Sequence, residues 1–204
     1  AQSLRSTGHR PYVVPYGGSN TTGAVGFVEA VRELTDQLGR SGESITHIVF
    51  ASSSGGTQAG LTVGKSLFGL DCELIGIGID KGASGDVPFE EHVVRLANAT
   101  AERLDVPQRF SSSDFSIRND YLGRGYGVVG ELERRAIRLV DQTEGILLDP
   151  VYTGRAMGGL IDMIERGELS SEHSVLFWHT GGTPALFPYA KDLAEATAGE
   201  ETTP

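Results

Sequence analysis

The hydrophobic pattern of the first half of the chain alternates between helical and strand-like blocks. Between residues 24 and 38 apolar side chains recur at close to the helical period, which predicts an amphipathic helix. Continuous apolar runs at residues 45–50 and 73–79 predict strands that are buried on both faces. Residues 57–68 predict a helix between these strands, and residues 12–15 predict a short strand ahead of them.

The second half continues this alternation after one interruption. Residues 87–104 predict a helix that stops before Pro107, since the residue preceding a proline disfavours helical geometry. Residues 105–128 are polar and rich in glycine, which predicts irregular structure. The remaining predicted elements are a helix at 129–143, a short strand at 146–148, a helix at 154–166 and a last strand at 175–178.

Repeated alternation of strands and helices predicts an α/β fold with a mainly parallel sheet flanked by helices. In such sheets ligands bind beyond the carboxyl ends of the strands. Three segments of the chain fall at that edge, namely residues 52–57, 149–154 and 179–183. Candidate functional residues are therefore sought in these segments.

The passage from strand to helix within residues 48–61 favours an anion site. A helix N-terminus presents unpaired N–H groups and the positive end of the helix dipole, and phosphate suits both. The glycine and hydroxyl positions of the connecting loop are Ser53, Ser54, Gly55, Gly56 and Thr57. The glycines admit a ligand close to the backbone, and the hydroxyls add donors. Because the loop lacks both the Walker A lysine and the dinucleotide spacing, a cofactor phosphate is favoured over ATP or NAD. An ordinary strand–helix turn is the alternative.

Residues 149–154 lie where the predicted short strand meets the next helix. Asp149 or Thr153 could cap this helix, with Tyr152 packed beside it, which would be a purely structural motif. Alternatively, the Tyr152 phenol lies at the ligand edge as an acid/base or ring-stacking group. The residues alone leave both interpretations open.

Two further segments carry candidate chemistry. Tyr126 stands between glycines, as on a mobile loop that contacts a substrate, although a simple surface turn explains it equally well. After the last strand, His179 and Thr180 precede two glycines that leave room for a planar ligand. The Thr180 hydroxyl could bond a ring nitrogen. A single histidine at a strand end is more typical of a structural hydrogen-bond partner than of a base.

Composition narrows the possible functions. The 204 residues carry a net charge of −10, which disfavours nucleic acid and anionic membranes as partners. Cys72 is the only cysteine, so neither a disulfide framework nor a cysteine metal cluster is expected. The histidines show no metal-ligand spacing, and no Gly-x-Ser-x-Gly motif indicates a serine hydrolase. No apolar stretch approaches the length of a membrane span, and a cytoplasmic location is expected.

Five segments, taken in order, resemble one family. They are residues 14–19, 54–60, 125–127, 149–154 and 179–186. Together they resemble the pyridoxal-phosphate enzymes of the fold shared with tryptophan synthase β. The branch is the one that contains D-cysteine desulfhydrase and 1-aminocyclopropane-1-carboxylate deaminase. The resemblance runs from about residue 11 to about residue 190.

The resemblance implies a pyridoxal 5'-phosphate cofactor, a small amino-acid substrate and no metal. The implied cofactor-binding residues are Ser53, Ser54, Gly55, Gly56, Thr57, Thr153 and Thr180. The implied catalytic residues are Tyr126 and Tyr152, which would face the substrate and the pyridine ring.

Two positions bear on the activity within the branch. Thr153 stands where the deaminases carry an acid, and Thr180 stands where they carry an apolar residue. A hydroxyl beside the pyridine nitrogen gives a weaker electron sink than a carboxylate, adequate for α-proton loss and β-elimination. This favours D-cysteine desulfhydrase, which converts D-cysteine to pyruvate, ammonia and sulfide. The deaminase, a cysteate sulfo-lyase and a non-catalytic remnant that binds a phosphorylated ligand are the alternatives.

One family feature is not matched. Family members begin with a segment that holds the Schiff-base lysine, whereas Lys65, Lys81 and Lys191 stand in other contexts. We therefore expect the C-terminal portion of the family's large domain in residues 1–195 and a disordered tail in residues 196–204. The isolated chain is expected to be inactive. For the intact protein the resemblance implies a homodimer.

Overall fold

A computed structural model describes residues 1–80, 83–84 and 87–194. Within these residues the main sheet has four strands in the order β5-β2-β1-β6, and all neighbouring pairs are parallel. The strands are β1 (His47–Ser52), β2 (Glu73–Gly78), β5 (Ser116–Arg118) and β6 (Val175–Trp178). A small antiparallel pair is formed by β3 (Ala83–Ser84) and β4 (Val87–Pro88). The predicted α/β fold with a mainly parallel sheet is confirmed.

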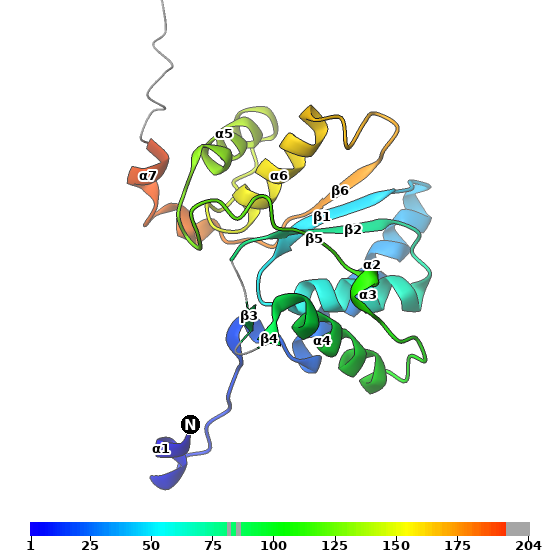
Figure 1. The fold of residues 1–204 in the computed structure, drawn as a ribbon, viewed down its shortest axis with the longest axis vertical. Coiled ribbons are helices and arrows are strands. Elements are labelled where there is room, and N and C mark those ends of the chain that lie inside the picture. Colours follow the sequence, from blue (N-terminus) through cyan, green and yellow to red (C-terminus); the bar gives the residue numbers. More distant parts are fainter. Residues whose placement is uncertain (81–82, 85–86, 195–204) are drawn as a thin grey trace, which may run out of the picture.

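Helices flank the sheet on both sides (Figure 1). One side carries α2 (Thr21–Ser41), α3 (Gly56–Phe68) and α4 (Phe89–Arg103). The other carries α5 (Glu131–Glu144) and α6 (Thr153–Glu165). These five helices confirm the five that the hydrophobic pattern predicts. The short elements are α1 (Gln2–Ser6), which lies away from the body, α7 (Ala190–Ala194), and 3-10 turns at Tyr16–Gly18, Ser112–Asp114 and Thr183–Leu186.

Strand β1 lies in the interior of the sheet, and its sequence explains why. Ile48, Val49 and Phe50 are fully buried, because helices cover both faces of the strand. In the register of the sheet Val49 pairs with Ile75 of β2 and with Phe177 of β6. The parallel register brings the carboxyl ends of β1, β2 and β6 to one edge.

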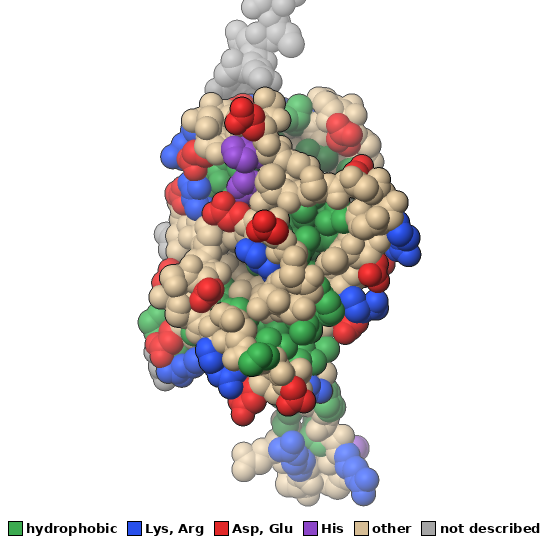
Figure 2. Space-filling view, turned by 90° about the vertical axis from the view of Figure 1, so that its right-hand side faces the viewer, with side chains coloured by type: hydrophobic (Ala, Val, Ile, Leu, Met, Phe, Trp, Pro, Cys, Tyr) green, Lys and Arg blue, Asp and Glu red, His purple; other side chains and the backbone are tan. Residues whose placement is uncertain are grey.

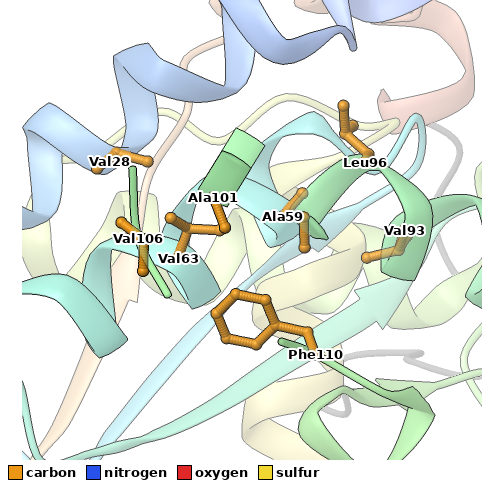
Figure 3. Close-up of a cluster of buried hydrophobic side chains, with 9 residues drawn as sticks. Val28, Ala59, Val63, Val93, Leu96, Ala101, Val106 and Phe110 are labelled. Carbon is orange, nitrogen blue, oxygen red and sulfur yellow. The ribbon is translucent and has the colours of Figure 1, made fainter. Parts of the chain in front are cut away.

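A hydrophobic cluster fixes the layer of α2, α3 and α4 (Figure 3). Val28 of α2 packs with Ala59 and Val63 of α3 and with Val93 and Ala101 of α4, and all five are buried. The small side chains of α3 allow its neighbours to approach closely. Because α3 is packed against α2, α4 and the sheet, its N-terminus has a fixed place at the carboxyl edge.

Two predicted strands are wrong. Residues 12–15 form an exposed extended segment, in which Tyr12 is 80% exposed and no described strand pairs with it. Residues 146–148 are likewise unpaired within the described residues, and only Leu148 is buried. Both segments have the composition of a strand, but a strand also needs a neighbour that accepts its backbone hydrogen bonds.

One strand escapes prediction. Residues 105–128 were expected to be irregular, but they contain β5, which pairs with β2 through Ile117 opposite Gly76. With only three residues, two of them polar, β5 gives no apolar run. Its position at the edge of the sheet explains why such a sequence suffices.

The surface of the molecule is mixed in charge. Over the face seen in Figure 2, acidic and basic side chains are interspersed, and no broad basic patch is visible there. In the part of the chain that the structure describes, no helix combines the length and the apolar character needed to cross a bilayer. The predicted tail at 196–204 lies outside the described residues.

Candidate active site

A pocket of about 350 Å³ opens at the carboxyl edge of the sheet, a volume within the range of small-ligand sites. The three segments predicted to meet at this edge all contribute to it, as does the turn after residue 15. Its lining residues are Tyr16, Gly17, residues 51–55, Thr57, Gln58, Tyr152 and residues 180–182. The predicted convergence of the three segments is thus confirmed.

The N-terminus of α3 brings unused hydrogen-bond donors to this pocket. Gly55 caps the helix in the left-handed region (φ 85°), and the Gly56 N–H donates to Ser19 Oγ at 3.0 Å. Among the described residues, the backbone N–H groups of Thr57 and Gln58 have no protein acceptor. Two free N–H groups at the positive end of a helix dipole form an anion site.

Ser19, which lies outside the loop, holds residues 53–57 in place by hydrogen bonds; we call these five residues the cradle. Its hydroxyl donates to Ser54 Oγ at 2.7 Å and accepts from the Gly56 N–H. A Cβ at position 56 would lie 2.7 Å from Ser19 Oγ, so only a glycine lets the two segments meet this closely. The turn that carries Tyr16 is therefore tied to the start of α3.

Gln58 anchors the same helix end to the sheet. Its side chain is buried, with Oε1 accepting from Ser52 Oγ at 2.5 Å and Nε2 donating to the Ser116 carbonyl at 3.3 Å. One side chain thus joins α3 to both β1 and β5. A buried amide that is satisfied on both sides holds the first turn of α3 rigidly.

The N-terminus of α6 is built in the opposite way. The fully buried Asp149 carboxylate accepts from the N–H groups of Val151 (2.8 Å), Tyr152 (2.9 Å) and Thr153 (2.7 Å). The Thr153 hydroxyl donates to Asp149 Oδ1 and accepts from the Asp149 N–H, each at 2.8 Å. Asp149 is therefore the cap of this helix. Thr153 is fully buried and does not line the pocket.

The loop after β6 closes the pocket from a third side. Thr180 lines it, and Gly182 (φ 96°) lies so close to Asp149 that a Cβ would come within 2.7 Å of that side chain. His179 Nδ1 accepts from the Gly181 N–H at 3.0 Å, so Nε2 carries the proton that is donated to the Leu147 carbonyl at 3.1 Å. His179 is thus the structural partner that the sequence favours.

Two tyrosine hydroxyls meet beside the pocket. The Tyr126 and Tyr152 hydroxyls are hydrogen-bonded, and the two rings pack edge to face with centroids 5.9 Å apart. Burial raises the pKa of Tyr152 above its ordinary value of 10.0, and the bond to Tyr126 raises it further. Tyr152 therefore holds its proton firmly at neutral pH. The structure brings together the two tyrosines that the sequence singles out.

A third tyrosine stands on the same side. Tyr16 lines the pocket, and partial burial together with the nearby Tyr126 hydroxyl raises its pKa. Next to it, Ser53 Oγ donates to Asp80 Oδ1 at 3.1 Å, so the first hydroxyl of the loop is turned toward the end of β2. Ser54 and Thr57 are the loop hydroxyls placed beside the free N–H groups.

The sequence prediction missed four residues of this site, Tyr16, Ser19, Gln58 and Arg155. Gln58 directly follows the predicted loop. Ser19 and Tyr16 lie in residues 14–19, where the glycine-rich turn is the signal that could have found them. Arg155 is fully buried behind the tyrosines. The sequence near Arg155 carries no signal of its burial, because α6 also contains the charged residues Asp162 and Glu165. No group of His, Cys, Asp or Glu in the described residues is arranged to hold a metal ion.

Comparison with protein families identifies the chain. Residues 1–181 match the family described as "Pyridoxal-phosphate dependent enzyme". The chain belongs to this family. Two relatives, both named D-cysteine desulfhydrase, come from Klebsiella pneumoniae strain 342 (43% identity) and from Klebsiella pneumoniae subsp. pneumoniae strain ATCC 700721 / MGH 78578 (42% identity). Each match covers 95% of this chain and 57% of the relative.

A solved structure supports the same family. A protein described as an ACC deaminase homologue superposes with a TM-score of 0.84 at 36% identity, over 95% of this chain and 56% of that one. The chain thus spans a little over half the length of the relatives that it matches.

The residues of the pocket fit the cofactor of this family. The free N–H groups of Thr57 and Gln58 suit a phosphate, and Ser54 and Thr57, which carry hydroxyls, line the same pocket. Neither described lysine lines the pocket. Lys65 lies nine residues along α3 from Gly56, about 13 Å on the helix axis, and Lys191 lies on α7. Lys81 falls outside the described residues.

Proposed function

We propose that this chain forms the phosphate- and ring-binding part of a pyridoxal-phosphate-dependent carbon–sulfur lyase. The observation that carries the proposal is the open N-terminus of α3 opposite Tyr152 and Thr180 in one pocket. The N–H groups of Thr57 and Gln58, with the hydroxyls of Ser54 and Thr57, would bind the phosphate. The proposed cradle comprises Ser53, Ser54, Gly55, Gly56 and Thr57.

We propose D-cysteine as the substrate, on the strength of the two relatives named D-cysteine desulfhydrase. The reaction breaks the C–H bond at Cα and the C–S bond at Cβ, and one water is consumed in forming pyruvate, ammonia and sulfide. The bound cofactor would supply the electron sink that makes the α-proton removable. The Thr180 hydroxyl would bond the ring nitrogen.

The tyrosine pair would act by holding protons. Because the pKa of Tyr152 is raised, its hydroxyl is a donor at neutral pH and can bond the departing sulfur as negative charge develops there. In this arrangement the Tyr126 hydroxyl donates to the Tyr152 oxygen, which leaves the single Tyr152 proton for the sulfur and fixes its direction. Thr153 would contribute indirectly: its hydroxyl donates to the Asp149 carboxylate, and this carboxylate in turn positions Tyr152.

We further propose that residues 1–195 belong to one cofactor-binding domain and that the intact protein is a cytoplasmic homodimer. The continuous sheet supports the domain assignment. Cys72, the only cysteine, is buried as a free thiol, which is typical of a reducing compartment. The net charge of −10 argues against nucleic acid as a partner. Sedimentation of the intact protein tests the dimer.

The chain has a built-in reporter for cofactor binding. Trp178, its single tryptophan, lies at the end of β6, two residues before Thr180. Pyridoxal phosphate bound in the pocket should quench its fluorescence saturably, and inorganic phosphate should compete. Ser54→Ala should weaken binding about fivefold, as expected for the loss of one hydrogen bond. Ser66→Ala, on the same helix but far from the cradle, is the matched control.

Two outcomes would overturn the proposal. Quenching that never saturates, or that Ser54→Ala and Ser66→Ala change equally, means that the cradle does not hold the phosphate. For the reaction, we expect no pyruvate from D-cysteine with this chain alone, because neither Lys65 nor Lys191 reaches the pocket. Phosphate binding without pyruvate release by the intact protein would instead favour a non-catalytic binding protein.

A further inference from the structure

One buried ion pair lies directly behind the tyrosines. Arg155 Nε donates to Glu133 Oε1 at 2.6 Å, and the side chains are only 1% and 3% exposed. Glu133 Oε2 in turn accepts from the Gly130 N–H at 2.7 Å, at the start of α5. Removing two charges from water is costly, and such a pair is weak evidence for stability by itself. The other hydrogen bonds of the Arg155 guanidinium indicate what this ion pair does.

Those other bonds converge on the loop that carries Tyr126. Arg155 Nη1 donates to the carbonyls of Leu122 (2.9 Å) and Gly125 (3.2 Å), and Nη2 donates to that of Val128 (3.0 Å). The three carbonyls bracket Tyr126 on both sides. A loop with glycines at three positions in this stretch would otherwise have much freedom.

The same guanidinium also joins two further elements near the pocket, the end of β2 and the start of α6. Nη1 donates to the Ile79 carbonyl at 2.9 Å, next to Asp80, whose carboxylate accepts from the phosphate loop through Ser53. Arg155 itself lies in the first turn of α6, three residues after Tyr152. A single side chain therefore joins the end of β2, the Tyr126 loop and the helix that presents Tyr152.

We propose that Arg155 is a positioning residue, which holds Tyr126 in hydrogen-bonding contact with Tyr152. The inference rests on the proposed function, in which this tyrosine pair faces the substrate. The planar guanidinium is essential to it, because only a fork of several N–H donors can bond four carbonyls and a carboxylate at once. A lysine keeps the positive charge beside Glu133, but all of its N–H groups lie on one nitrogen. It therefore cannot bond acceptors that lie in several directions around a guanidinium.

Arg118 provides a matched comparison within the same chain. Whereas Arg155 is bonded to one carboxylate, Arg118 is bonded to two, those of Asp120 (2.8 Å) and Glu168 (2.7 Å). Its guanidinium lies 5.8 Å from the ring centroid of Tyr121. It donates to no carbonyl of the Tyr126 loop. Arg118→Lys should therefore disturb Tyr121 and leave the other two tyrosines as they are.

The test uses the full 204-residue chain with 13C-labelled tyrosine rings. In Arg155→Lys the Tyr126 and Tyr152 signals should move toward free-tyrosine values, and Tyr152 should titrate closer to its ordinary pKa. Amide exchange in residues 123–129 should accelerate about tenfold or more, as for a loop that loses its anchoring bonds. Arg118→Lys should shift only the Tyr121 signal.

If Arg155→Lys does not fold, Arg155→Met combined with Glu133→Leu removes both charges together and should restore folding. The loop should still be released in that variant. Unchanged Tyr126 and Tyr152 signals in a folded variant would overturn the positioning role.

Binding of inorganic phosphate is measured in parallel, because Arg155 does not touch the cradle. Wild-type chain that fails to bind phosphate would overturn the proposed function. The tyrosine signals would still decide the role of Arg155 separately.

Discussion

Two helices of 13 residues begin at the same pocket, and they treat their first turns in opposite ways. At α6 the buried Asp149 carboxylate takes up the N–H groups of Val151, Tyr152 and Thr153. At α3 no carboxylate among the described residues accepts from the first N–H groups, and Ser19 accepts only from Gly56. The start of α6 thus has a carboxylate acceptor of its own, whereas at α3 the N–H groups of Thr57 and Gln58 have no acceptor among the described residues.

The difference shows how two helix N-termini at one pocket can serve different purposes. A terminus that is closed by its own carboxylate cannot bind an anion, but it is rigid and can present a side chain, here Tyr152. An open terminus offers the donors that an anion site needs, but it depends on outside support, which Ser19 and Gln58 supply. The residue types decide between the two outcomes: aspartate before α6, and serine and glycine before α3.

The largest expected effect comes from breaking the closed terminus. Asp149→Ala leaves three backbone N–H groups without their acceptor, two of them in fully enclosed positions. We expect the unfolding free energy to fall by about 3 kcal/mol, measured by urea denaturation. Asp149→Asn keeps one carbonyl oxygen as acceptor and should lose roughly half as much. Equal stability of Asp149→Ala and wild type would contradict the assignment of the cap.

A substitution at the open terminus of α3 should lower the affinity for phosphate more than it lowers the free energy of unfolding. Gly56→Ala places a Cβ 2.7 Å from Ser19 Oγ and so drives the cradle and Ser19 apart. Affinity for inorganic phosphate should fall about tenfold, or ~1.4 kcal/mol, by calorimetric titration. Gly26→Ala on α2 is the control, since open space surrounds its Cβ. A similar loss in both variants would mean that the close approach at Gly56 is unimportant.

Ser19→Ala tests the outside support by itself. It removes the acceptor of the Gly56 N–H and the donor to Ser54 but adds no bulk. The unfolding free energy should fall by about 1 kcal/mol. Phosphate affinity should fall less than in Gly56→Ala, because the free N–H groups keep their places. Affinity lower than that of Gly56→Ala would show that Ser19 itself contacts the anion.

The open terminus could be predicted from the sequence, because its determinants are local. Residues 45–68 carry a buried strand, a loop of small residues and a helix in direct succession, and that order alone places N–H groups at the sheet edge. The same holds for the main helices, whose apolar period is strong. By contrast, β5 is too short and too polar to be recognised as a strand from the sequence. Residues 12–15 and 146–148 have the composition of strands, but no described strand pairs with them.

The supports of the site could not be predicted, since their partners lie far away in the sequence. Ser19 meets Ser54 across 35 positions, and Arg155 meets Ile79 across 76. Nothing near Arg155 in the sequence indicates that its charge will be buried. The closed terminus was half-predicted: the sequence offered both Asp149 and Thr153 as caps, and only the fold shows that they bond each other.

The smallest effect at neutral pH is expected for Tyr126→Phe, and it tests what the closed terminus presents. Burial and the Tyr126 hydroxyl both raise the pKa of Tyr152. A raised phenol pKa stabilises the fold fully below pH 10.0, the ordinary value, and this contribution is lost as pH rises toward the folded pKa. Tyr126→Phe removes the second cause, so the pKa of Tyr152 should fall toward 10.0 and stability should decline less steeply above that pH.

Tyrosinate absorbance measures this shift, and Tyr152→Phe identifies the step that belongs to Tyr152. Tyr121, whose pKa is raised to about 12 by burial and by its bond to Asp162, is the internal reference, because its hydroxyl is bonded near the far end of α6, ten residues after Tyr152. At pH 7 the variant should lose less than about 1 kcal/mol, since the lost bond is partly exposed. A Tyr152 step that stays in place would mean that burial alone holds the proton, and that the closed terminus presents Tyr152 without help from the Tyr126 loop.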